Sequence, residues 1–269
     1  MVLESLADPK NAQDKPLHVF ILSFIFSFIA VFFANVMFPS ESSLLSIALI
    51  TIMFIPFFQK MFEIDEQKED ATARKQRRDN LWARHASTIY AFSAFFLGVV
   101  IALSMVFVFF PEFSQTFGLQ SETVQRLSGS VLGSGTLDKF LFNNTQVMIL
   151  VFILSFMFGA GSIFVLAWNA SVISVYVGLM VQSIIKTGIA PATAYAFGLP
   201  AGLGSIALHG IPEISAYFIA GLAGGILSVG MIRENILSKE FRQILRDSLV
   251  FLAAAEVLII VAAYIEVGL

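Results

Sequence analysis

The sequence predicts an all-α, polytopic helical membrane protein with about seven transmembrane helices and one re-entrant segment. Hydrophobic residues make up 57% of its 269 residues and charged residues only 13%, and the mean hydropathy is +0.84. Several apolar runs reach the length of about 20 residues that an α-helix needs to cross a bilayer. Soluble domains carry about 25% charged residues, so this composition excludes a soluble fold.

Residues 1–85 are predicted to form an N-terminal transmembrane hairpin with a charged cytoplasmic helix. Apolar runs at 17–38 and 43–62 are separated only by a short polar turn, so their helices are expected to be antiparallel neighbours. The segment before them mixes acidic residues with lysines and precedes a run of full bilayer length, which is unlike a cleaved signal peptide. Residues 63–85 carry six acidic and six basic residues, which predicts a solvated helix.

Residues 86–269 are predicted to form a second transmembrane domain. Its expected spans are 87–110, 145–166, 168–185, 212–232 and 247–267. A very short turn around 167–171 joins the second and third of these spans. Residues 111–144 are expected to form an outer loop, and the Ser-Gly repeats at 128–135 favour a flexible linker because no Lys-Ser/Thr follows the glycines.

The apolar run 189–208 is broken by helix-disrupting residues. They are Pro191, Gly198, Pro200, Gly202 and Gly204. Proline and glycine weaken helices, and non-helical backbone at membrane depth must be covered by protein or line a water-filled cavity. The run is therefore predicted to be a re-entrant pair of half-helices that enters and leaves from the outer face. The alternative is an ordinary eighth span, which would place the C-terminus inside.

Lysine and arginine predict the orientation of the spans. They concentrate in 63–85 and 233–247, whereas few fall in the segments predicted to lie outside. Cytoplasmic loops of membrane proteins carry an excess of these residues. We therefore expect a multi-pass protein of the cell membrane with a cytoplasmic N-terminus and an external C-terminus.

The stretch His209-Gly210-Ile211-Pro212-Glu213 places two ionisable side chains in a strongly apolar region. Such groups are costly in a bilayer and often mark functional sites. Pro212 is expected to start a helix, with Glu213 in the first turn near the positive end of the helix dipole. A buried pair in which His209 and Glu213 only satisfy each other is an equally good interpretation.

Two asparagines are further candidate site residues. Asn144 precedes an expected span and Asn169 falls in an expected turn, so both are interpreted first as helix caps. If they converge on Glu213 and His209, they would supply neutral oxygens to an ion-binding or substrate-binding site. Glu256 is the only charged residue deep in the last span and is expected to face the bundle interior.

Several kinds of chemistry are not indicated. The chain has no cysteine, which excludes disulfides and thiol chemistry, and its three histidines do not form a zinc-binding pattern. No catalytic constellation is recognisable, so we expect neither an enzyme nor a cofactor. A net charge of −3 without a basic block argues against nucleic acid as a partner.

A series of motifs runs through the second domain. It comprises Asn143-Asn144, Gly159-Ala160-Gly161, Asn169, the His209–Glu213 box and Ala220-Gly221-Leu222-Ala223-Gly224-Gly225. Over roughly 86–269 this series resembles the stage II sporulation protein M family of integral membrane proteins. Where that family usually has Asn-Gly, this chain has Asn169-Ala170. The resemblance implies a helical membrane protein in which Asn144, Asn169, His209 and Glu213 are the characteristic positions.

Two functions fit these features. The first is a channel or transporter for a small ion or solute, in which Glu213 binds a cation or proton and His209 assists. The second is a non-catalytic scaffold that organises partner proteins, as in envelope or membrane remodelling. In the second case small residues at helical spacing, such as Ala216, Ala220 and Gly224, would pack against a second copy or a membrane-protein partner. In both cases the lipid bilayer is the surrounding medium.

Overall fold

The computed structural model describes residues 16–75, 80–131 and 137–268, and the described chain is helical throughout its regular elements. Seven helices in these ranges are long and apolar enough to cross a membrane. They are α3 (Pro16–Met37), α4 (Ser42–Lys75), α5 (Leu81–Phe109), α7 (Leu137–Phe158), α8 (Ser162–Ile185), α9 (Pro191–Arg233) and α10 (Lys239–Gly268). The predicted all-α membrane fold is therefore confirmed.

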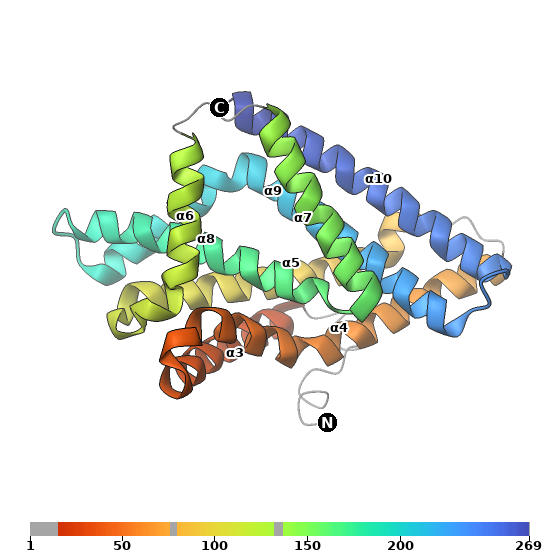
Figure 1. Ribbon diagram of the computed structural model, residues 1–269, viewed down its shortest axis with the longest axis horizontal. Helices are drawn as coiled ribbons and strands as arrows, with labels where there is room; N and C mark the ends of the chain where they lie inside the picture. The colour runs from red at the N-terminus through yellow and green to blue at the C-terminus, as the bar shows by residue number, and fades with distance from the viewer. Residues whose placement is uncertain (1–15, 76–79, 132–136, 269) are drawn as a thin grey trace.

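Several helix connections lie at two opposite ends of the molecule, whereas the turn between α7 and α8 lies between these ends (Figure 1). At one end lie the short helix η1 (Pro39–Glu41), the turn after α5 and the connection between α8 and α9. The end of α4 and the connection between α9 and α10 lie at the other end. This alternation agrees with helices that cross the membrane in turn.

The segment expected to be an outer loop is mostly helical. It contains η2 (Pro111–Phe117), α6 (Gly118–Val131) and the first two turns of α7. In Figure 1, α6 stands across the direction of the long helices. Gln120 on α6 donates a hydrogen bond to the carbonyl of Ser43 at 3.3 Å, which fixes α6 against the start of α4. Part of the expected Ser-Gly linker, 132–136, lies outside the described residues.

The charged segment after the second span is not a separate solvated helix. It continues α4 to Lys75, and α5 begins at Leu81 with the Asn80 side chain accepting from the backbone N–H of Trp82 at 3.1 Å. Asp65, Glu66 and His85 are buried rather than exposed. At these three positions the expected exposure is not found, because Asp65 contacts His85 on α5 and Glu66 pairs with Arg233 on α9.

The turn between α7 and α8 lies at 159–161, earlier than predicted. Gly159 adopts a φ of 66°, a left-handed conformation that glycine adopts at little cost. Asn169 consequently lies inside α8 and not in a turn, and Asn144 lies inside α7 and not at its start. Both expected helix caps are thus wrong, because the helices extend past the apolar runs that were used to delimit them.

Residues 191–233 form one continuous helix, α9, with Pro200 and Pro212 inside it. The expected pair of half-helices and the helix start at Pro212 are not found. Instead α9 bends in its first part and then continues toward the opposite end of the molecule (Figure 1). Before the bend α9 lies against α8, where Gly198 faces Val181 and Gly202 faces Val177.

Small residues let α9 approach its neighbours closely. Ala216, Ala220 and Gly224 are all buried within the chain. A Cβ at Gly224 would lie 2.4 Å from the carbonyl oxygen of Phe152 on α7, and Ser155 donates to the carbonyl of Gly221 at 2.6 Å. The small-residue stripe therefore packs α9 within this chain and is not exposed to a partner.

Candidate functional site

Glu213 lies at the centre of a polar cluster between α7, α9 and α10. One turn further along α9, the buried Tyr217 donates a hydrogen bond from its hydroxyl to the Glu213 carboxylate at 2.8 Å. Residues four apart share one face of a helix, so α9 itself brings these two side chains together. Tyr217 is only 1% exposed, which holds its hydroxyl in place.

Asn144 reaches the same carboxylate from α7, with a side-chain hydrogen bond to Glu213. The Asn143 amide donates to the side-chain oxygen of Asn144 at 3.1 Å, which leaves the amide hydrogens of Asn144 to face Glu213. Asn144 is itself buried. Asn144 and Tyr217 thus present neutral donors to Glu213 from two helices.

Glu266 completes the cluster from the end of α10. Its carboxylate lies close enough to Glu213 and Tyr217 to interact electrostatically with both. We call Asn144, Glu213, Tyr217 and Glu266 the Glu213 cluster. Within the part of the chain that the structure describes, Glu213 forms no ion pair with a lysine or arginine.

His209 and Asn169 do not join the cluster through hydrogen bonds. His209 lies one turn before Glu213 on α9, half-buried, and its Nδ1 atom is buried without a hydrogen-bond partner among the described residues. Asn169 donates to the carbonyl of Val165 on its own helix at 2.8 Å. The structure therefore brings Asn144 to Glu213, whereas His209 lies one turn earlier on α9 and Asn169 bonds within α8.

The matched region of the chain supports a family assignment. The family model of stage II sporulation protein M matches residues 87–269, about two thirds of the sequence. The chain belongs to the stage II sporulation protein M family. No curated protein and no solved structure matches the chain.

The whole Glu213 cluster lies in the region that carries the stage II sporulation protein M match. The match begins near the start of α5 and does not include α3 or α4. These two helices nevertheless pack tightly on the family region. Gly98 on α5 lies so close to α3 that an added Cβ would be 2.6 Å from the carbonyl oxygen of Phe20. The predicted boundary at 85/86 stays a prediction.

A second polar contact joins α7 to α10. The Thr145 hydroxyl lies 3.0 and 3.3 Å from the two carboxylate oxygens of Glu256. Glu256 faces α7 within the helix bundle, as its position in the last span predicted. Successive residues of α7, Asn144 and Thr145, therefore serve carboxylates on two different helices.

A third polar group lies at the end of the molecule where α4 stops. Its members come from α4, α5, α9 and α10. They are Asp65, Glu66, Lys68, Arg84, His85, Arg233 and Asp247, and we call them the charged end. In contrast to the Glu213 cluster, each acidic residue here is paired with a cationic side chain or a histidine.

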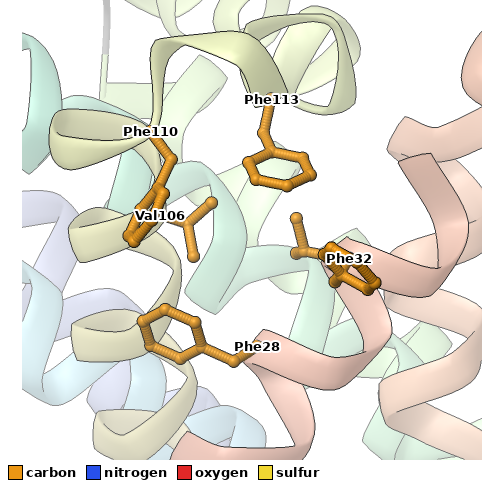
Figure 2. A pocket seen from close by; sticks show the side chains of 6 residues that line it. Phe28, Phe32, Val106, Phe110 and Phe113 are labelled. Atoms are coloured by element: carbon orange, nitrogen blue, oxygen red, sulfur yellow. The ribbon is translucent and has the colours of Figure 1, made fainter. Parts of the chain in front are cut away.

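The structure also contains an apolar cavity of about 100 Å³, which is lined by phenylalanine and valine side chains. Figure 2 shows the aromatic rings that surround it at the junction of α3, α5 and η2. Its lining residues are Phe28, Val31, Phe32, Val106, Phe110 and Phe113. None of the predicted site residues lies there.

The described residues contain no group of three or more His, Cys, Asp or Glu side chains that could hold a metal ion.

Sequence reasoning missed Tyr217 and Glu266. The i, i+4 spacing from Glu213 was a usable signal for Tyr217. Glu266 gave no such signal, because only the tertiary packing of α10 against α9 brings it to Glu213.

Proposed function

We propose that this protein moves a proton or small monovalent cation across the membrane through a site centred on Glu213. The observation that carries the proposal is the environment of Glu213, which receives hydrogen bonds from neutral side chains and has a second carboxylate, Glu266, beside it. A carboxylate in a membrane bundle without a paired cation retains its capacity to attract one.

The arrangement of the helices supports the same conclusion. The site is built from three membrane helices, and Glu213 directly follows Pro212, a proline inside α9. Membrane transport proteins often place ion-binding side chains where a helix departs from regular geometry. His209, with its unpartnered nitrogen one turn away, is a further group that can accept or release a proton at this site.

We place the charged end in the cytoplasm, because arginines and lysines concentrate in 63–85 and 233–247. The N-terminus is then cytoplasmic and the C-terminus external. Asn144 and Glu266 lie near the external ends of α7 and α10 in this orientation, so the Glu213 cluster is reached from outside.

The test is flux through purified protein in liposomes. We expect proton or potassium flux, read with trapped pH-sensitive and potassium-sensitive dyes, and its loss in Glu213→Gln. Glu256→Gln is the matched control, because Glu256 is also a membrane carboxylate but is held by Thr145 outside the cluster. Absence of both fluxes from the parent protein, with Glu213→Gln still folded, would contradict the proposal.

One observation favours a non-catalytic scaffold as the alternative. The hydrogen bonds from Tyr217 and Asn144 also suffice to stabilise Glu213 as a purely structural group. Under this alternative Glu213→Gln lowers stability in detergent and no flux is seen. The buried small-residue stripe on α9 cannot then provide the association surface, so partner binding would depend on other faces of the helices.

A further inference from the structure

The charged end joins two pairs of helices through two ion pairs. Arg233 at the end of α9 lies 3.1 Å from Glu66 on α4, and Arg84 on α5 lies 3.2 Å from Asp247 on α10. Glu66 is almost fully buried and Arg84 and Asp247 nearly so. Each pair connects a helix of the α4–α5 unit with a helix of the α9–α10 unit.

The α4–α5 unit is held together independently of these ion pairs. Fully buried Asp65 on α4 receives hydrogen bonds from Lys68 at 2.8 Å and from Thr88 on α5 at 2.5 Å, and it lies 3.4 Å from His85. Lys68 also donates to the carbonyl of Arg84 at 3.1 Å. These contacts fix α4 to α5 through a buried network.

The α9–α10 unit has its own connections. Only five residues, 234–238, separate the two helices, and the Ser248 hydroxyl on α10 donates to the carbonyl of Ala223 on α9 at 3.1 Å. The two ion pairs therefore lie at the seam where the α4–α5 pair packs on the α9–α10 pair. Phe251 on α10 packs beside them against Trp82 on α5, with ring centroids 5.2 Å apart.

Between the Glu213 cluster and these ion pairs the seam is apolar. Phe218 follows Tyr217 on α9 and stacks on Phe92 of α5 at 5.7 Å, and Phe92 contacts Phe62 of α4 at 6.0 Å. Phe62 also lies against Gly225 on α9, where an added Cβ would be 2.5 Å from the ring. An ion leaving the Glu213 cluster toward the charged end would meet this aromatic layer and then the ion pairs.

We infer that the ion pairs Glu66–Arg233 and Arg84–Asp247 form a gate that closes the charged end of the transport path. This inference rests on the proposed function. Packed interfaces switch between discrete arrangements, and separation of the α4–α5 unit from the α9–α10 unit would open the aromatic layer. The structure then represents the state closed at this end.

The absence of cysteine allows the gate to be locked chemically. In the double variant Glu66→Cys with Arg233→Cys the ion pair is removed, and a bifunctional thiol reagent with a reducible spacer can bridge the two sites. We expect proton or potassium flux in liposomes to rise in the uncrosslinked variant, to be lost after crosslinking and to return after reduction. The control is Glu122→Cys with Arg126→Cys, an exposed pair within α6 that lies outside the seam.

Charge exchange provides a second measurement that does not depend on crosslinking. Glu66→Gln is expected to raise flux about tenfold by weakening the closed state, whereas Glu66→Arg combined with Arg233→Glu restores a pair and returns flux toward the parent rate. Lys60→Gln is the control, since its partner Glu63 is on the same helix.

The outcomes separate the two proposals. If flux stays at the parent rate in the double-cysteine variant, before and after crosslinking, and in the charge-exchange variants, the gate is overturned. The Glu213 site would be unaffected by this result. Absence of flux from the parent, the Glu66→Gln variant and the reduced double-cysteine variant would overturn both. Flux that responds to the gate variants but not to Glu213→Gln would support the gate and contradict the role of Glu213.

Discussion

The Glu213 cluster and the charged end stabilise carboxylates within the helical bundle with different kinds of partners. At the charged end Asp65 is fully buried and is surrounded by Lys68, Thr88 and His85. In the Glu213 cluster the donors are Tyr217 and Asn144, and the carboxylate of Glu266 interacts electrostatically with Glu213.

This difference separates structural from functional carboxylates. A buried carboxylate that is already paired with a cationic side chain binds a further cation only weakly. Removal of its partner leaves an uncompensated buried charge. An acid served by neutral donors depends less on any single neighbour and still attracts a cation. We therefore expect loss of the buried Asp65 charge to affect stability most, and loss of the Glu213 charge to abolish flux.

The largest loss of stability is expected for Asp65→Asn. The substitution removes the charge that compensates Lys68 and the contact to His85 inside a buried network, which should lower the free energy of unfolding by about 3–5 kcal/mol. Reversible unfolding in mixed micelles measures this change. Glu63→Gln, in the exposed pair with Lys60, should change it by less than about 0.5 kcal/mol. Equal effects of the two variants would contradict the comparison.

An intermediate loss is expected for Gly225→Ala, between the two regions. Its methyl group would meet the Phe62 ring at 2.5 Å, and the overpacking should lower the free energy of unfolding by about 1–2 kcal/mol even after the gain in helix propensity. Gly204→Ala on the same helix meets no atom within 4 Å and should stabilise the protein by about 0.5–1 kcal/mol. The same unfolding measurement applies, and effects of equal sign at both glycines would show that close packing at Gly225 is not decisive.

The smallest loss is expected for Tyr217→Phe. It removes one hydrogen bond to Glu213 and leaves the one from Asn144, so the free energy of unfolding should fall by about 1 kcal/mol. Combining it with Glu213→Gln in a double-mutant cycle isolates the contact between the two side chains. A loss as large as that of Asp65→Asn would assign the Glu213 cluster to the structural class and weaken the transport proposal.

Much of the fold could be predicted because the length of each apolar run indicates whether its helix can cross the bilayer. Apolar runs indicated seven spans, but the run 145–166 is displaced by eight residues from α7 (Leu137–Phe158), and the run 212–232 is only the second half of α9 (Pro191–Arg233). The ends were less accurate. Charged residues on α4 and polar residues on α7 extend their helices beyond the apolar runs, and tertiary pairing decides this extension. At Pro200 and Pro212 the packing of α9 against its neighbours outweighed the tendency of proline to end a helix.

The candidate site could be predicted only in part. Glu213 was visible because an acid in an apolar stretch is costly, and Asn144 because of its place in the family-like motif series. The pairing of Asn144 with Glu213 depends on α7 crossing α9, and Glu266 depends on α10 returning along α9. Asn169 was misplaced because the turn it was assigned to lies at Gly159.

The continuous α9 helix also has a mechanical consequence. Glu213 and Arg233 are separated by five and a half turns of this helix, about 30 Å, which is close to the thickness of the hydrocarbon core. The bend lies in the first part of α9, so the segment from Glu213 to Arg233 can act as one stiff lever (Figure 1). A tilt of about 10° at Glu213 would displace Arg233 by about 5 Å, more than the length of an ion pair.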